Sequence, residues 1–545
     1  MATLSDHGDW FGIFKRTPHY AQLKERPIAY FCAEFALDAT VHTYSGGLGV
    51  LSGDVIREAA DREIPIIGVG LYYNKGYICK PHEDGNHFVE VCDTILPTDV
   101  GLEPVVDGSG ARVIVSVPVQ DRELRIQAWR RMVKSVPVYF LDTNVEGNSE
   151  ADRAITDRLY IGVKETRLLQ EVVLGIGGLR MLEALQYHPS VYHLNEGHPA
   201  LLTLELIRHQ MRERSIGFDE AKQFARRRVV FTNHTLVPAG NEIYDNDLVA
   251  LTLTTYAQQL GVPVDALVTL GLVHESSTFS LTMLSLRMSS VANGVSKLHA
   301  VKAKHVWASH PMVGITNGVH LDTWSDIPPD TNAPGSLWAA HQERKQRVLE
   351  LVRERVGRSW GADELLLGWA RRIADYKRPL AVFEDTKRFL DIAREQGKRV
   401  HLIIAGQPHP NDTNGLALQA QIRRVTEEMG DAAVYLHDFD IDMAQKLVAG
   451  CDVWLNTPIV GYEASGTSGM KAALNGVLPC STKDGWVAEI DLYGIGWSLE
   501  SEGVGANLLD VLERDIVPMY YERDASGVPA VWERHMHAAR QTILD

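Results

Sequence analysis

Residues 399–439 read RVHLIIAGQPHPNDTNGLALQAQIRRVTEEMGDAAVYLHDF. Two short apolar runs, RVHLIIAG (399–406) and AAVYLHDF (432–439), flank a stretch, 414–430, whose apolar residues recur every three or four positions. The runs have the length and the β-branched and aromatic content of buried strands, and the stretch between them has the period of a helix. This order predicts a parallel βαβ unit, because parallel neighbours need a crossover connection.

The same alternation continues through most of the chain. Further buried strands are predicted from the runs PIAYFCAEF (27–35), VYHLN (191–195), RVVFTNH (228–234), LLLGWARR (365–372) and CDVWLNTP (451–458). Helices are predicted over 156–187 and 336–356, where apolar residues have helical spacing. The alternation is typical of doubly wound α/β folds, in which helices cover both faces of a parallel sheet.

The length of the chain, 545 residues, favours two large domains. The stretch LDTWSDIPPDTNAPG (321–335) has three prolines and several turn formers and is the predicted boundary. We therefore expect an N-terminal α/β domain over 1–322 and a C-terminal α/β domain over 323–505. Helices in 506–545 are expected to cross back to the first domain. Such folds bind ligands at the carboxyl ends of their strands, so a cleft between two sheets is the expected site.

Composition excludes several classes of protein. Lys and Arg total 54 against 70 Asp and Glu, and the net charge of -16 argues against a nucleic-acid partner. No apolar run is long enough for a membrane span, and MATLSDHGDWFGIFKR at the N-terminus lacks the apolar core of a secretory signal. A cytoplasmic protein with no membrane partner is expected. The five cysteines (Cys32, Cys79, Cys92, Cys451 and Cys480) fit neither a metal site nor a disulfide framework.

The first polar motif is Tyr44-Ser45-Gly46-Gly47-Leu48-Gly49, directly before a predicted helix. Glycines in front of a helix leave backbone N–H groups open to an anion. The dinucleotide-binding fingerprint fails because Ser52 stands at its third glycine position, and no Walker A motif occurs. From the residues alone, a simple tight turn is an equal explanation.

Two further motifs follow predicted strands of the second domain. RRIADYKR (371–378) has four cations in eight residues, which suits phosphate, although charge runs are often solvated helix faces. YEASGTSGMKAALNG (462–476) places Ser, Thr and Gly before a predicted helix that carries Lys471. A lysine near a positive helix end and apolar neighbours is a candidate for a Schiff base, and an ordinary surface lysine is the competing interpretation.

The segment 463–475, EASGTSGMKAALN, resembles the pyridoxal-phosphate attachment signature of the α-glucan phosphorylases. That signature reads Glu-Ala-Ser-Gly, then Met-Lys, then Leu-Asn at fixed gaps. Five other motifs occur in the family's order: SGGLG (45–49), HLNEGHP (193–199), FTNHTLVPAGNE (231–242), ITNGV (315–319) and RRIADYKR (371–378). The chain is similar to a short, bacterial-type member of the glycogen, starch and maltodextrin phosphorylases.

The resemblance implies a GT-B architecture, with two Rossmann-like domains that face a central cleft. It implies that the domain over 1–322 binds glucan and that the domain over 323–505 binds pyridoxal phosphate. It implies reversible phosphorolysis of the non-reducing-end bond of an α-1,4-glucan or maltodextrin by inorganic phosphate, which gives α-D-glucose 1-phosphate with retention. The implied cofactor is pyridoxal 5′-phosphate, tied to Lys471 through its aldehyde. Its phosphate group would face the substrate phosphate and take part in acid–base catalysis. Two adjacent phosphates need fixed cations that offset their repulsion.

The family's phosphate-binding roles can be carried over by position. Arg372 and Lys377 would bind the substrate phosphate and the cofactor phosphate. Backbone N–H groups of Gly47 and Leu48 would add donors to the substrate phosphate. The cofactor phosphate would be held by Thr467, Ser468 and Gly469.

Sugar-binding roles carry over in the same way. The hydroxyls of the cleaved glucose would be bound by Asn317, Glu463, Ser465 and Gly466. The backbone carbonyl of His234 would face the anomeric carbon, and its ring the 6-hydroxyl. His198 and Glu196 would line the acceptor end. Structural roles stay open as alternatives for His198, His234 and Asn317.

Some residues depart from the family pattern. Gln407 stands where a lysine is common, and Phe439 where a tyrosine is common. The chain is also several hundred residues shorter than the long members, so a homodimer, allostery and acceptor length stay open.

Two alternatives use the same fold. One is a nucleotide-sugar GT-B glucosyltransferase, which would not need the signature at 463–475. The other is a non-catalytic glucan-binding relative, for which residues 407 and 439 are the support. An aminotransferase-type enzyme is disfavoured, because no strand-end Asp is evident as a partner of the cofactor's ring nitrogen.

Overall fold

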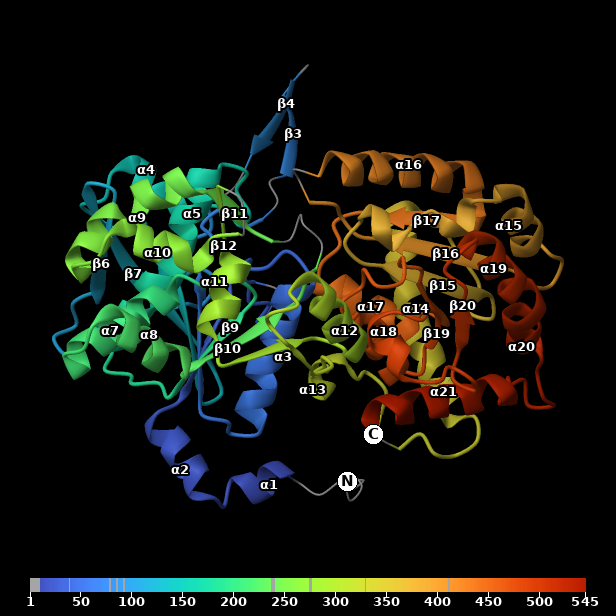
Figure 1. Ribbon diagram of the computed structural model, residues 1–545. Helices are drawn as coiled ribbons and strands as arrows, with labels where there is room; N and C mark the ends of the chain where they lie inside the picture. Colours follow the sequence, from blue (N-terminus) through green and yellow to red (C-terminus); the bar gives the residue numbers. More distant parts are fainter. Residues whose placement is uncertain are drawn as a thin grey trace. The chain divides into compact units, whose positions relative to one another are not determined.

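The computed structural model describes residues 10–38, 40–77, 80–84, 87–91, 94–236, 241–273, 277–328, 330–409 and 412–545. The chain divides into two compact units. The N-terminal unit comprises Asp9–Val295 and Ala300–Ile315, and the C-terminal unit comprises Ser296–His299 and Thr316–Asp545 (Figure 1). Within the described ranges, no helix combines the length and apolar character that crossing a membrane requires.

The N-terminal unit is built on a ten-stranded sheet. Its order is β14 (Val313–Gly314), β13 (Val291–Gly294), β10 (Val229–Asn233), β9 (Val191–Asn195), β1 (Ile28–Phe31), β2 (Ile66–Leu71), β8 (Val136–Asp142), β7 (Arg122–Val133) and β5 (Glu103–Pro104), with β6 (Ile114–Val119) on β7. Neighbouring strands from β14 to β8 are parallel, as the sequence predicts. Helices pack against this sheet and complete the α/β unit (Figure 1).

One end of this sheet departs from the expected parallel arrangement. Strand β7 runs antiparallel to β5, β6 and β8. Two-residue turns at 120–121 and 134–135 join β6 to β7 and β7 to β8, with φ of 53° at Gln120 and 50° at Lys134. Such short turns with left-handed residues connect antiparallel strands only, so this part of the sheet is a meander. The fold class is therefore mixed α/β.

The C-terminal unit has a six-stranded sheet that is parallel throughout. Its order is β17 (Ala433–Leu436), β16 (Val400–Ala405), β15 (Leu365–Ala370), β18 (Val453–Asn456), β19 (Leu478–Thr482) and β20 (Trp497–Leu499). Residues 399–439 form β16, α16 (Thr413–Met429) and β17, and β16 and β17 pair in parallel. The βαβ prediction is confirmed.

Each sheet has one point at which the strand order reverses. In the C-terminal unit, β16 lies on one side of β15 and β18 on the other. In the N-terminal unit, β2 lies on one side of β1 and β9 on the other. Connections that leave such a point in opposite directions open a crevice at the carboxyl ends of the two strands, where open α/β sheets bind ligands.

The predicted helices match less closely than the strands. Helix α14 (Ser336–Val356) spans the predicted range and ends at Gly357, whose φ of 69° suits a glycine C-cap. The helix expected over 156–187 begins only at Lys164: α5 (Lys164–Val172) continues through a π turn (Val173–Gly177) into α6 (Gly178–Ala184). Tyr160 adopts a φ of 56°, which a right-handed helix cannot include.

The last part of the chain belongs to the core of the C-terminal unit. It forms α19 (Val504–Val511), a π turn (Leu512–Ile516), α20 (Val517–Tyr521) and α21 (Ala530–Leu544). Trp532 and Met536 of α21 are fully buried in the same apolar cluster as Tyr520. Helix α21 packs on α18 (Thr467–Leu474). These helices thus bury apolar residues within the C-terminal unit.

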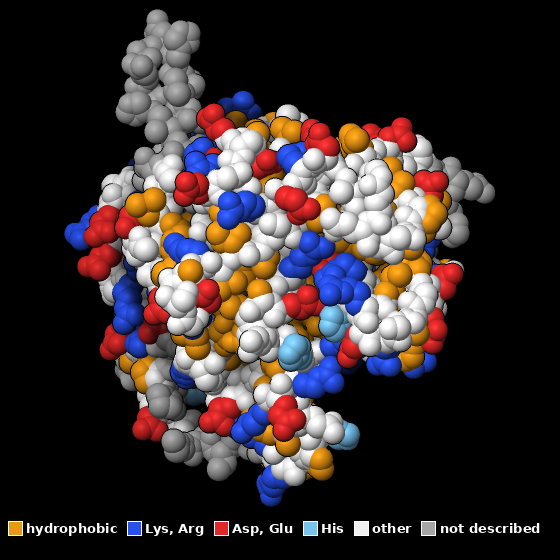
Figure 2. Space-filling view, turned by 90° about the vertical axis from the view of Figure 1, so that its left-hand side faces the viewer, with side chains coloured by type: hydrophobic (Ala, Val, Ile, Leu, Met, Phe, Trp, Pro, Cys, Tyr) orange, Lys and Arg blue, Asp and Glu red, His pale blue; other side chains and the backbone are white. Residues whose placement is uncertain are grey.

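Charged side chains of both signs share the surface. On the face drawn in Figure 2, Lys and Arg are interspersed with Asp and Glu. On that face, the basic side chains do not form a continuous patch of the kind that binds the phosphates of a nucleic acid.

Candidate functional site

The basic loop 371–378 leaves the carboxyl end of β15, at the switch point of the C-terminal sheet. Arg371 is buried, and its Nη2 donates to the Leu455 carbonyl of β18 over 2.9 Å. Burial lowers the pKa of Arg371 to about 10. The next residue, Arg372, is exposed. Arg371 therefore ties the loop to the sheet, and Arg372 is the arginine of this pair that a ligand can reach.

Lys377 and Glu463 meet at this switch point, from two different motifs. Lys377 Nζ lies 2.5 Å from Glu463 Oε2, and both side chains are almost buried. Burial alone would raise the pKa of the Glu463 carboxyl, but the charges of Lys377 and Arg371 outweigh it, so the pKa is lowered. The predicted phosphate-binding cation and the predicted sugar-binding carboxylate thus form one ionised cluster.

Lys471 is a buried lysine on α18. The helix starts after Gly466, whose φ of 79° requires the left-handed conformation that glycine adopts easily. Lys471 is 6% exposed, and its Nζ lies 3.7 Å from the centroid of the Trp324 ring. The interpretation as an ordinary surface lysine is therefore wrong. Trp324, to which the sequence analysis assigned no role, lies against the amine.

Polar groups near the start of α18 differ in whether they have a hydrogen-bond partner among the described residues. Trp454 Nε1 donates to Ser468 Oγ over 3.2 Å. Among the described residues, the buried Ser465 Oγ and Trp486 Nε1 have no hydrogen-bond partner. These two residues are neighbours, because the backbone N–H of Trp486 donates to the backbone carbonyl of Ser465 over 3.0 Å. Unpaired buried polar atoms are uncommon, and a polar ligand at this helix start would satisfy them.

Close packing favours glycine at position 469. A Cβ there would come within 3.3 Å of the Trp486 ring. The buried Thr467–Leu474 helix and the indole therefore approach each other more closely than larger residues would allow. Thr467 and Ser468 remain half-buried at the helix start, where the dipole favours an anion.

Asn317 belongs to the same unit and is half-buried. The hydroxyl of its neighbour Thr316 donates to both Glu489 carboxylate oxygens, over 2.8 and 2.9 Å. Glu489 thus holds the ITNGV segment. Gln407, the residue in place of a lysine, holds the basic loop through its backbone, since its carbonyl accepts the Ile373 N–H over 3.0 Å. Phe439 is half-buried just after β17.

In the N-terminal unit, Gly47 and Leu48 begin α3 (Gly47–Asp61), beyond the carboxyl end of β1. A Cβ on Gly46 or Gly47 would meet nothing within 4 Å. Gly46 is extended at a φ of -165°, and Gly47 is helical, so neither conformation requires glycine. Packing and backbone geometry therefore leave both glycines unexplained, whereas close approach of a ligand to the backbone explains them.

His234 follows β10 and is held by residues of the HLNEGHP motif. Its backbone N–H donates to Glu196 Oε2 over 2.8 Å, and its Nε2 contacts Asn195 Oδ1. Glu196 is 4% exposed and adopts a φ of 72°. Burial raises the pKa of Glu196 to about 7. A strained, buried carboxyl group with this pKa is typical of a functional site.

His198 lies in a buried ionic network. Its Nδ1 is 2.9 Å from Arg167 Nη2 and 3.3 Å from Glu171 Oε1. Burial opposes the charge of Arg167, but Glu171 and Glu242 outweigh it and raise the pKa of the guanidinium. This network gives His198 a structural role. The ring nitrogen Nε2 is the part of His198 left for a ligand.

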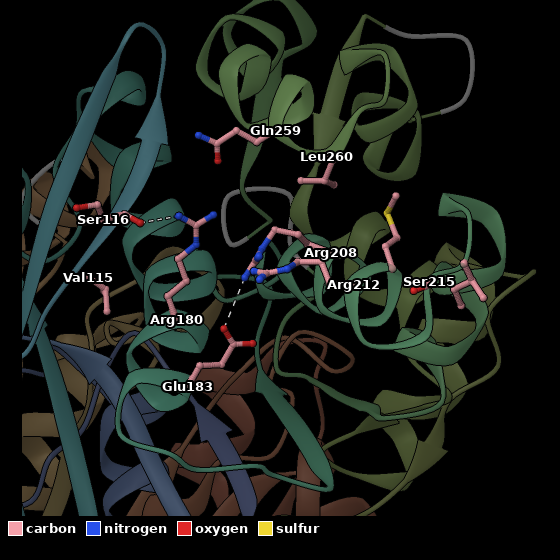
Figure 3. Close-up of a pocket in the computed structure, with 11 residues that line it drawn as sticks. Val115, Ser116, Arg180, Glu183, Arg208, Arg212, Ser215, Gln259 and Leu260 are labelled. Carbon is pink, nitrogen blue, oxygen red and sulfur yellow. Dashed lines mark hydrogen bonds and ion pairs between the residues drawn. The ribbon is translucent and has the colours of Figure 1, made fainter.

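A cavity of about 880 Å³ lies elsewhere in the N-terminal unit (Figure 3). It is lined by Arg180, Arg208 and Glu183 among others, and by none of the predicted site residues. Arg180 and Arg208 both pair with the buried carboxylate of Glu205, and Arg208 also faces Glu183. The cavity's guanidinium charges are therefore largely balanced by the protein itself.

Comparison with known proteins identifies the family. The model of the carbohydrate phosphorylase family matches residues 179–324 and 313–494. The chain is 35% identical to a maltodextrin phosphorylase of Thermococcus litoralis, over 92% of this chain and 67% of the relative. It is 34% identical to a glycogen phosphorylase of Mycobacterium tuberculosis, over 96% of this chain and 69% of the relative. It is 31% identical to a glycogen phosphorylase of Aquifex aeolicus, over 97% and 85%.

The family match and the named relatives place the chain among the glycosyltransferase-type enzymes of carbohydrate metabolism. The chain belongs to the carbohydrate phosphorylase family.

Proposed function

We propose that the chain is an α-1,4-glucan phosphorylase of GT-B architecture that uses pyridoxal 5′-phosphate and retains the anomeric configuration. The observation that carries this proposal is the pairing of Lys377 with Glu463 at the switch point of a sheet whose next helix holds a buried lysine, Lys471. Cations suited to phosphate and a carboxylate suited to sugar hydroxyls then belong to one cluster.

The residues of the C-terminal unit fit the cofactor. Lys471 offers a buried amine against an aromatic ring. The aldehyde of the cofactor would need such an amine to form a Schiff base. Thr467, Ser468 and Gly469 offer a helix start for its phosphate, and the unpaired Ser465 Oγ and Trp486 Nε1 offer further polar contacts. When bound, the cofactor supplies a phosphate group that exchanges a proton with the substrate phosphate.

The chain's own side chains bind and orient the substrates. Arg372 and Lys377 hold phosphate and offset the repulsion between two anions. Gly47 and Leu48 donate backbone N–H groups to the substrate phosphate. The glucose hydroxyls are bound by Glu463, Ser465, Gly466 and Asn317.

Histidines complete the sugar-binding set. The carbonyl of His234, fixed by the bond from its N–H to Glu196, faces the anomeric carbon, where positive charge develops. His198 lines the acceptor end through Nε2. Glu463 binds hydroxyls in this scheme, because an ionised carboxylate beside Lys377 is no proton donor.

Glucose 1-phosphate release tests the proposal. The purified chain is supplied with pyridoxal 5′-phosphate and maltodextrin, with and without inorganic phosphate. Phosphate-dependent release supports the proposed reaction. No release from a chain that has bound the cofactor points to a glucan-binding relative, and no release together with no cofactor binding refutes the proposal.

A further inference from the structure

Glu34 is a buried carboxylate that contacts the start of the glycine-rich motif. It lies three residues beyond β1 and is 2% exposed. Its Oε2 accepts the Ser45 N–H over 2.7 Å, the Ser45 hydroxyl over 3.2 Å and the Gly46 N–H over 3.3 Å. The carboxylate therefore satisfies the donors just before α3.

The glycine pattern of the motif separates two kinds of position. A Cβ on Gly49 would lie 2.4 Å from the Tyr44 Cβ and 3.0 Å from Glu34 Oε2, so this glycine allows Glu34 to approach. A Cβ on Gly46 or Gly47 would meet open space. Gly49 is thus explained by its close contacts with Tyr44 and Glu34, whereas Gly46 and Gly47 have open space beside the backbone.

The second oxygen of Glu34 is held as well. Oε1 accepts the hydroxyl of Tyr160. The Tyr160 ring has the Arg167 guanidinium 4.9 Å from its centroid. A carboxylate with both oxygens engaged in this way is fixed in one orientation and its charge is partly offset.

We propose that Glu34 is a positioning residue for phosphate: it holds Ser45 and Gly46 so that the N–H groups of Gly47 and Leu48 are left for the substrate anion. The inference rests on the proposed function. Within the described part of the chain, no hydrogen bond of the Gly47 or Leu48 N–H to another residue is recorded. Glu34 accepts the backbone N–H groups of Ser45 and Gly46. The next N–H groups along the motif, those of Gly47 and Leu48, are therefore the first ones available to an anion.

Steady-state kinetics with Glu34→Ala and Glu34→Gln test this role. Glu34→Ala removes the acceptor of both amides, so we expect the KM for inorganic phosphate to rise about tenfold, while the KM for maltodextrin stays within about twofold. Glu34→Gln keeps one oxygen that accepts an N–H and should recover most of the phosphate affinity. Equal rises in both KM values, or an unchanged KM for phosphate, would overturn the proposal.

Hydrogen–deuterium exchange of the peptide over residues 44–50 gives a readout that needs no activity. Exchange in this peptide should be faster in Glu34→Ala than in the wild type, since the Ser45 and Gly46 N–H groups lose their acceptor. Asp54→Asn is the matched control. Asp54 is a buried carboxylate on α3 that pairs with Arg57 and not with the N–H groups of the glycine-rich motif. If the wild type releases no glucose 1-phosphate, the proposed function fails. Exchange then decides alone for Glu34, and unchanged exchange refutes its contact with the loop.

Discussion

Lys377 and Glu463 are 86 residues apart in the sequence, yet their charged groups lie 2.5 Å apart and are about one-tenth exposed. Removal of the Glu463 charge would leave Lys377 buried without its carboxylate partner. Lys377 therefore sets the orientation and the ionisation of the carboxylate that we propose binds a glucose hydroxyl.

Glu463→Gln should lower the free energy of unfolding at pH 7 by about 3 kcal/mol, because it leaves Lys377 without its partner. The pKa of Glu463 is lowered from the ordinary 4.5, so the stability that this group contributes is present above pH 4.5 and is lost as the pH falls through its folded pKa. Urea denaturation at pH 7 and below pH 4 measures both effects. The wild type and the variant should converge in acid, and a constant difference would contradict this account.

Glu196→Gln should change the pH dependence of stability in the opposite sense. The pKa of Glu196 is raised from 4.5 to about 7, so the folded protein holds a proton that the unfolded chain has released. The wild type should therefore lose stability as the pH rises from 4.5 to 7, with a slope of at most about 1.4 kcal/mol per pH unit. In urea titrations at several pH values, the free energy of unfolding of the variant should change less between pH 4.5 and 7 than that of the wild type. Glu58→Gln, at an exposed ion pair, is the control that should keep the wild-type slope.

Lys471→Ala should lose cofactor retention and activity together, since it removes the buried amine. Absorbance of pyridoxal 5′-phosphate that stays with the protein through gel filtration, and glucose 1-phosphate release, are the measurements. Lys446→Ala is the control, because Lys446 is a half-exposed lysine paired with Asp442 on the surface of α17 (Ile441–Gly450). Full activity of Lys471→Ala would refute the assignment of the cofactor.

Arg372→Ala should keep the cofactor and lose turnover by about 10²–10³-fold, the scale expected when one preorganised charge-stabilising group is removed. Bound cofactor and kcat are measured on the same preparation. Arg358→Ala changes an exposed arginine of the same unit, just beyond α14, and should leave kcat unchanged. A similar loss in both variants would mean that Arg372 acts through stability alone.

Local patterns predicted much of this fold. The runs at 191–195 and 399–406 form the strands Val191–Asn195 and Val400–Ala405, within a residue of the predicted ends, because each is a buried apolar segment between polar turn residues. The left-handed turns at Gln120 and Lys134, which make part of the first sheet antiparallel, were missed. Only glycine and asparagine signal such turns reliably, and neither stands there.

The site was predictable where its residues lie in one motif. Lys471, Thr467 and Ser468 share one helix start, so their spacing carries information. Trp324 lies 147 residues before Lys471, and Glu34 joins Tyr160 over 126 residues. Contacts between distant segments depend on how the whole unit packs, and no periodicity in a single sequence reports them.

The packing of α21 on the helix that carries Lys471 has a consequence during synthesis. Met536 fills the space above Gly476, whose hypothetical Cβ would lie 3.1 Å from the methionine's terminal carbon. Chains emerge from the ribosome N-terminus first, and α21 begins at Ala530 whereas α18 ends at Leu474, so α18 can bury the face that contacts α21 only after α21 has been synthesised. A nascent chain that has not reached Ala530 would therefore lack the packing of Met536 over Gly476.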